Sequence, residues 1–161
     1  MSTPMSILIA VMATFGTSAM ELDPDDVFCL AQNIYFESSI EQRNGKAAVA
    51  HVTLNRVENR RYPDNVCGVV WQHRQFSWTQ DGKSDRIPLY DARRREQPWV
   101  YDAWIESAEV AIEAMLALSQ DPTEGANYYY AHDLVTPSWS EQFTVAAVIG
   151  NHTFMRRPRG S

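Results

Sequence analysis

Glu37 is the residue whose type and setting most suit acid–base chemistry. It directly follows two aromatic residues, Tyr35 and Phe36, and it falls in line with Leu30 and Ile34 at helical spacing. A carboxylate held against apolar and aromatic surface loses hydration, so its pKa rises. A carboxylic acid with a raised pKa can act as a general acid near neutral pH. The alternative is an ordinary solvated glutamate at a helix end, because charged side chains are mostly exposed.

A second group of residues has the composition of a sugar-binding surface. Residues 75–82 combine aromatic rings, amides and hydroxyls, and the Asp81-Gly82 pair indicates a turn. Aromatic rings stack on pyranose faces while amides bond the hydroxyls. A packed surface loop is the alternative interpretation. The residues that we expect to line a glycan groove are Gln75, Phe76, Ser77, Trp78, Tyr128, Tyr129 and Tyr130.

The cysteines and histidines allow two rival chemistries. A cysteine peptidase acting on wall peptides would pair Cys29 or Cys67 with a histidine, but Cys29 lies among acidic and apolar residues, whereas reactive thiols favour cationic neighbours. A zinc amidase would need closely spaced ligands, and the chain has no such pair. The available histidines are His51, His73, His132 and His152. We expect no metal and no cofactor.

The helix that positions Glu37 has a well-defined start. Asp23 is a good N-cap, because its carboxylate can accept from free backbone N–H groups, and Pro24 suits the first helical position. Asp25 and Asp26 place negative charge at the positive end of the helix dipole. The apolar stripe consists of Val27, Leu30, Ala31 and Ile34.

The remaining pattern predicts an α+β fold that is mainly helical. We expect a buried helix at 46–57, a helix or strand at 66–72, an irregular stretch at 83–97, a helix at 98–119 and short strands at 127–132 and 145–149, although the last could be helical. The strands are expected to pair as a small hairpin.

Residues 1–20 resemble a secretory signal, and residues 21–161 are expected to form one domain. An apolar run at 6–16 precedes small residues, with a cleavage site expected near Ala19. The absence of Lys and Arg before the apolar run favours the alternative, an N-terminal helix packed on the domain. We expect export to the periplasm or the cell exterior. In an exported protein, Cys29 and Cys67 would form a disulfide rather than remain buried thiols.

Charge and hydropathy exclude two classes of partner. The net charge is −6 and the basic residues are scattered, so we expect no nucleic acid. No stretch approaches the roughly 20 apolar residues of a membrane-spanning helix, so we expect no stable membrane insertion. We expect a monomer.

Six stretches along the chain carry a family resemblance. They include Ile34-Tyr35-Phe36-Glu37, Leu54-Asn55-Arg56 and Gln75-Phe76-Ser77-Trp78, and they run in order from residue 27 to about 155. In these motifs the chain resembles the SleB-like cell wall hydrolases, the spore cortex-lytic enzyme family. The resemblance implies a lysozyme-like, transglycosylase-like helical fold with a small β element, peptidoglycan glycan strands as substrate and Glu37 as the catalytic acid.

The chain also departs from the family pattern. The family usually reads Glu-Ala-Arg-Gly-Glu from the catalytic residue onward, whereas this chain has Glu37-Ser38-Ser39-Ile40-Glu41. The spore enzymes carry a separate wall-binding domain that is missing from this sequence. A phage-encoded lysin or a wall-remodelling enzyme is therefore as plausible as a germination enzyme.

The number of catalytic carboxylates separates two mechanisms for cleavage between N-acetylmuramic acid and N-acetylglucosamine. With Glu37 alone, the 6-hydroxyl of N-acetylmuramic acid can attack its own anomeric carbon, as in a lytic transglycosylase that leaves a 1,6-anhydro sugar. A hydrolytic muramidase would need a second carboxylate. The candidates for it are Glu41, Asp81 and Asp85. A glycan-binding module without catalysis is the non-enzymatic alternative.

Overall fold

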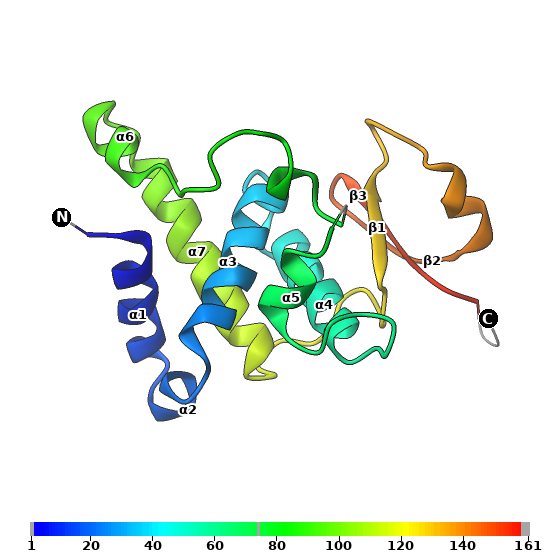
Figure 1. Cartoon of the computed structure of the whole chain (residues 1–161), viewed down its shortest axis with the longest axis horizontal. Coiled ribbons are helices and arrows are strands. Elements are labelled where there is room, and N and C mark those ends of the chain that lie inside the picture. Colours follow the sequence, from blue (N-terminus) through cyan, green and yellow to red (C-terminus); the bar gives the residue numbers. More distant parts are fainter. Residues whose placement is uncertain (1, 74, 159–161) are drawn as a thin grey trace.

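The molecule has a helical body with a small β-sheet at one end. The structure is a computed structural model, and it describes residues 2–73 and 75–158. The helices gather on one side and the strands at the opposite end, where the chain terminates (Figure 1). The helix α3 (Pro24–Ser38) lies at the centre of the body and packs on α7 (Pro98–Met115).

α3 forms as its sequence predicts. The Asp23 side chain caps it by accepting from the backbone N–H of Asp25 at 2.9 Å. The predicted apolar stripe is fully buried, with no exposed surface at Val27, Leu30 or Ile34. The helix continues one residue beyond Glu37, so Glu37 lies in a regular last turn.

Two long helices support α3. The helix α4 (Arg43–Val57) begins three residues earlier than predicted, while α7 ends four residues earlier. Two glutamates of α7 form ion pairs with residues of α4. Arg43 bonds Glu113 at 2.6 Å, and the buried Lys46 ammonium bonds Glu106 at 3.1 Å. These ion pairs fix the two helices relative to each other.

The prediction that residues 83–97 are irregular was wrong in part. Residues Leu89–Arg94 form the short helix α6, with Leu89 and Ala92 buried against the body. Only these two apolar residues turn inward, so the segment has too weak a helical pattern to be identified from sequence. Tertiary packing therefore decides this element.

Residues Val66–Val70 form the helix α5, so the segment predicted as a helix or a strand is a helix. A disulfide joins Cys67 of α5 to Cys29 of α3, so the predicted pairing is confirmed. The backbone N–H of Cys67 also donates to Asp26 Oδ1 at 3.1 Å. These contacts clamp α5 onto the first half of α3.

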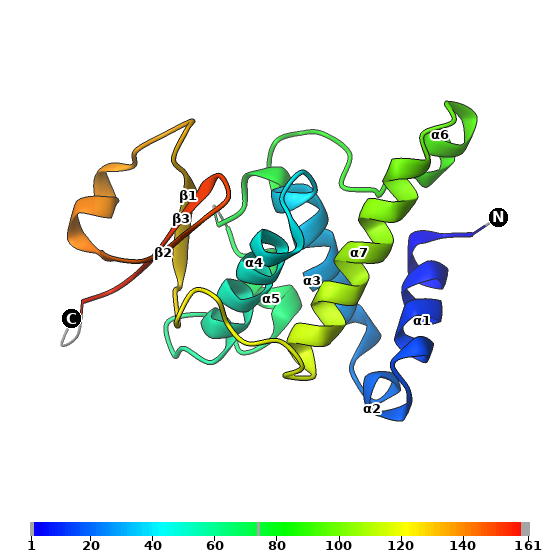
Figure 2. The same cartoon turned by 180° about the vertical axis from the view of Figure 1, so that it is seen from behind.

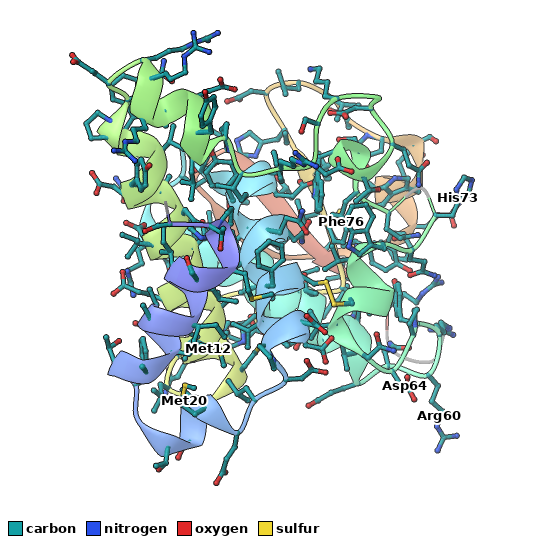
Figure 3. The ribbon with its side chains drawn as sticks, turned by 60° about the vertical axis from the view of Figure 1, so that its left-hand side comes forward. Met12, Met20, Arg60, Asp64, His73 and Phe76 are labelled. Carbon is teal, nitrogen blue, oxygen red and sulfur yellow. A yellow bond between two sulfur atoms is a disulfide. The ribbon has the colours of Figure 1, made fainter. Side chains whose placement is uncertain are left out.

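The N-terminal residues form two helices, α1 (Pro4–Thr14) and α2 (Thr17–Met20). α1 lies beside α7 in both views (Figure 2), and its Leu8 and Met12 are buried. The indole N–H of Trp104 donates to the carbonyl oxygen of Pro4 at 3.0 Å. In Figure 3 Met12 turns toward the body, whereas Met20 lies at the edge of the molecule. This packing agrees with the alternative of a docked helix, and cleavage near Ala19 stays a prediction.

Among the described helices, none combines the length and the apolar character that crossing a membrane requires.

The sheet has three antiparallel strands rather than the predicted two. Its order is β1 (Tyr128–Ala131), β3 (His152–Arg156), β2 (Thr144–Ile149), and an irregularity lies between Val145 and Ala147. Phe154 of the central strand is fully buried against Ala48 and Val52 of α4. The sheet is therefore docked on the end of the helical body that carries Glu37.

The disulfide should contribute measurably to stability. Cys29 and Cys67 are 38 residues apart, and closing a loop of this size stabilises a protein by about 3 to 4 kcal/mol in the chain-entropy model. We expect a Cys29→Ala/Cys67→Ala double variant to unfold at a lower urea concentration than the oxidised protein. Its unfolding free energy should be lower by that amount. Reduced wild type serves as the control. Equal unfolding midpoints for the oxidised protein, the reduced protein and the double variant would contradict a stabilising bond.

Candidate active site

Glu37 is partly buried in the last turn of α3, at the junction with the sheet. The phenol of Tyr129, on β1, donates to Glu37 Oε2 at 2.9 Å. Burial raises the pKa of Glu37, while the Tyr129 hydrogen bond and the positive charge of Arg56 oppose that shift. The carboxyl therefore has the raised pKa that its aromatic sequence setting predicted.

Two further residues beside Glu37 are functional candidates: Tyr129 on β1 and Arg56 on α4. Burial, and then the charge of Glu37, raise the pKa of Tyr129 well above its ordinary value, so its phenol stays protonated and can donate. Arg56, in the last turn of α4, is almost fully buried and donates from Nε to the Asn127 carbonyl oxygen at 2.8 Å. Its guanidinium lies over the Phe76 ring at 5.1 Å.

Sequence reasoning did not identify Arg56 as a site residue. The signal available in the sequence was the Leu54-Asn55-Arg56 motif. Its Asn55 also contacts the segment before β1, where its side-chain amide donates to the Ala126 carbonyl oxygen at 3.0 Å. Both residues tie the end of α4 to the start of β1.

Two hollows meet at Glu37. The first, which we call the strand-side hollow, has a volume of about 530 Å³ and runs from Glu37 along β1 to Trp139. The second, the loop-side hollow, has a volume of about 440 Å³ and includes Ile40, Glu41 and Leu134. The residues that line both are Glu37, Ser77, Ala131 and His152. A chain-like ligand could therefore extend on either side of Glu37.

Most of the predicted groove residues gather here. The strand-side hollow is lined by Gln75, Phe76, Ser77, Tyr129 and Tyr130, and the loop-side hollow by Ser77 and Trp78. Tyr128 lines neither, since its ring stacks on Phe143 at 4.5 Å between centroids. Figure 3 shows Phe76 turned into the molecule, whereas the neighbouring His73 extends outward.

Phe76 and Trp78 are buried beneath the surface of the hollows, so their rings are not available to stack on a sugar. They are 2% and 6% exposed, respectively. The indole N–H of Trp78 donates to Asn33 Oδ1 at 2.8 Å, and its ring stacks on Phe36 at 4.8 Å. These contacts hold the 75–82 segment against α3.

Of the three candidate second carboxylates, only Glu41 shares a hollow with Glu37. Asp81 is exposed and accepts from the backbone N–H of Lys83 at 2.9 Å, and Asp85 lies in another hollow, beside α1. Glu41 is only 8% exposed, accepts from the Asn151 N–H at 3.2 Å, and therefore has little freedom to reach a substrate.

Glu41 faces His152, which lines both hollows. Glu41 Oε1 lies 3.3 Å from His152 Nδ1, an ion-pair distance without hydrogen-bond alignment. Burial lowers the pKa of His152, while the charge of Glu41 opposes the shift. The pair therefore adds a largely uncharged imidazole to the wall of the site.

The rival chemistries find little support among the described side chains. Cys29 and Cys67 are the only cysteines in the chain, and their disulfide leaves no thiol for a cysteine peptidase. Within residues 2–73 and 75–158, no three His, Cys, Asp or Glu side chains gather closely enough to hold a metal ion.

A mainly helical domain with a small sheet and a partly buried glutamic acid between two hollows fits the class of glycan-cleaving enzymes. The model of the Cell Wall Hydrolase family matches residues 40–155, so the chain belongs to that family. The match begins just after Glu37. The resemblance found in the sequence motifs is therefore confirmed.

Curated relatives agree with this family. The chain is 34% identical over 130 residues to the spore cortex-lytic enzyme of Halalkalibacterium halodurans, covering 81% of this chain and 34% of that protein. It is 30% identical over 130 residues to the Bacillus subtilis spore cortex-lytic enzyme, covering 81% of this chain and 37% of that one. The chain thus spans little more than a third of these two relatives.

Solved structures agree with the fold. The catalytic domain of the germination-specific lytic transglycosylase SleB from Bacillus anthracis aligns with a TM-score of 0.65 at 27% identity, covering 84% of this chain and 98% of that one. The SleB catalytic domain from Bacillus cereus aligns with a TM-score of 0.59 at 28% identity, covering 83% and 91%. The predicted lysozyme-like, mainly helical fold is confirmed.

The hydrogen bond from Tyr129 should tune the acid. Because this bond lowers the pKa of Glu37, we expect Tyr129→Phe to raise that pKa further. A carbon-detected NMR titration of the Glu37 carboxyl measures the shift. Tyr130→Phe is the matched control. Tyr130 is the next residue in β1, but the phenol that donates to Glu37 is that of Tyr129. An unchanged or lowered pKa in Tyr129→Phe would contradict the geometry.

Proposed function

We propose that this chain cleaves peptidoglycan glycan strands between N-acetylmuramic acid and N-acetylglucosamine as a lytic transglycosylase. The observation that carries the proposal is Glu37, an acid with a raised pKa where two hollows meet. Family membership supports a wall substrate, and a structural neighbour is described as a lytic transglycosylase.

The first step needs a proton donor beside the glycosidic oxygen. Glu37 has a raised pKa, which keeps a proton available nearer to neutral pH. Tyr129 donates to Oε2, so the transferable proton of Glu37 belongs on Oε1. Proton transfer to the leaving oxygen breaks the bond to the anomeric carbon and leaves Glu37 as a carboxylate.

The second step uses that carboxylate as a base. The Tyr129 hydrogen bond and the Arg56 charge both favour the ionised form of Glu37, so they stabilise it once the proton has left. The 6-hydroxyl of N-acetylmuramic acid attacks the anomeric carbon and gives its proton to Glu37. The products are a 1,6-anhydro end and a regenerated acid, with no water consumed.

The second candidate function is hydrolysis by a muramidase mechanism. It is favoured by one observation, the presence of Glu41 in the loop-side hollow with Glu37. Against it, the Glu41 carboxylate is buried and accepts from the Asn151 N–H. We therefore assign Glu41 to holding the β2–β3 turn rather than to activating water.

The same proposal includes export, with peptidoglycan as the partner and a monomeric enzyme. The wall substrate of the family favours action outside the cytoplasm. Cleavage of residues 1–20 is part of this proposal, although Leu8 and Met12 of α1 are buried in the body. N-terminal sequencing of secreted protein that still begins at α1 would overturn the cleavage. The matched relatives give no support to a phage origin.

Removing the acid should abolish activity. Glu37→Gln keeps the side-chain volume but cannot supply the proton, so we expect turbidity loss of purified peptidoglycan to fall by at least about 10² to 10⁴-fold. Glu109→Gln, on the partly exposed side of α7, is the matched control and should retain activity. Clearing by Glu37→Gln at the wild-type rate would refute the assignment.

The same variant should also show a pH-dependent gain in stability. A raised folded-state pKa means that Glu37 stabilises the fold when protonated, below its unfolded pKa of about 4.3, and that this contribution is lost as the pH rises through the folded pKa. The difference in unfolding free energy between Glu37→Gln and wild type should therefore grow from acid to neutral pH. Urea denaturation across that range measures it, and a pH-independent difference would argue against a raised pKa.

The product decides between the two mechanisms. Digestion in ¹⁸O-labelled water should give 1,6-anhydromuramoyl ends without label, because the attacking oxygen belongs to the sugar. Mass spectrometry of the fragments makes the measurement. Reducing ends that carry one ¹⁸O would mean that water attacked, and Glu41→Gln would then be the next variant to test.

A further inference from the structure

We propose that Trp139 is the platform of a distal sugar subsite, which makes this enzyme bind long glycan strands better than short ones. The inference rests on the proposed function, because it assumes a glycan in the cleft. Trp139 lines the strand-side hollow that also contains Glu37. It belongs to the short helix η2 (Ser138–Gln142), in the connection between β1 and β2.

Trp139 is half-buried, and none of the aromatic rings around it stacks on it face to face. Its neighbours are Tyr128 at 46°, Phe143 at 65° and Tyr130 at 85° between ring planes, so none of the three stacks face to face. Trp78, by contrast, is stacked on Phe36 at 21°. Of these two tryptophans, Trp139 is the one placed to receive the apolar face of a pyranose.

Trp139 is nevertheless held in place. The hydroxyl and the N–H of Ser140 both donate to the Pro137 carbonyl oxygen, at 2.7 and 3.0 Å. The Arg157 guanidinium lies 5.2 Å from the Phe143 ring and donates to the Tyr128 hydroxyl at 2.9 Å. These contacts fix the rings around Trp139, and a preformed platform lowers the entropic cost of binding.

Polar groups that line the same hollow complete the subsite. Gln75, Ser77 and Gln80 are exposed and line the same hollow as Trp139. Within the described part of the chain, their side chains form no hydrogen bond to another side chain or to the backbone. A hollow with an aromatic surface and a few unengaged amides and hydroxyls matches a ring that is apolar on its face and polar at its rim.

The subsite should act on binding rather than on the chemical step. Contacts made equally in the ground state and the transition state change KM and leave kcat. We expect Trp139→Ala to weaken binding of long strands about tenfold, by analogy with ring stacking on aromatic side chains. Ligands too short to reach Trp139 should bind equally to both proteins.

The experiment measures affinity against ligand length in a full-length Glu37→Gln background, so that the ligand is not cleaved. Chitooligosaccharides from the disaccharide to the hexasaccharide are titrated by calorimetry into this protein with and without Trp139→Ala. The expected result is a gain in affinity with length that Trp139→Ala removes and Trp139→Phe largely keeps. Trp99→Ala, which changes a tryptophan that is 60% exposed on α7, is the matched control and should keep the gain.

Several outcomes would overturn the subsite. It falls if Trp139→Ala keeps the full length dependence, or if Trp99→Ala loses as much of it. Equal loss at every ligand length, with a lowered unfolding temperature, would mean that Trp139 only supports the fold. These results do not depend on Glu37, whose role fails separately if the Glu37→Gln variant still lyses peptidoglycan.

Discussion

The hydrogen bond from Tyr129 to Glu37 is the interaction on which the site depends. It joins the last turn of the central helix to the first strand of the sheet, and burial raises the pKa values of both groups that it links. A hydrogen bond to a charged group stabilises by about 1.5 to 3 kcal/mol, and an unpaired buried partner costs a similar amount. The helix must therefore stay regular through Ser38, and the sheet must dock closely enough to reach it.

The sheet contacts the helical body through both apolar packing and directional hydrogen bonds. Phe154 packs on Ala48 and Val52, while Arg56 and Asn55 bind the carbonyl oxygens of Asn127 and Ala126. Glu41 makes a third connection through the Asn151 N–H, in a space so narrow that a side chain on Gly150 would collide with the carboxylate. The apolar contacts supply adhesion, whereas the directional contacts set the position of β1 relative to Glu37.

The sequence was most informative where the determinants are local. The Asp23 cap, the α3 stripe and the acid at its end follow from spacing within one helix, and the disulfide was predicted from two cysteines and the expectation of export. The helix α6 was missed because its packing against the body decides it, and the early end of α7 was missed because the positive φ of Ala117 ends that helix. Trp139 was not among the predicted groove residues, because its contacts with Tyr128 and Tyr130 of β1 arise only in the folded chain. No spacing rule connects Arg56 to Glu37.

The acid and its phenol partner are 92 residues apart in sequence. The helices of the body are formed by residues earlier in the chain, whereas β1 pairs with β3, whose residues are near the end of the described chain. Contacts between such distant segments form more slowly than local ones. A nascent or partly folded chain therefore carries an incomplete cleft and an acid without its partner. The cleft that is proposed to hold the glycan is therefore complete only in a chain that includes β3.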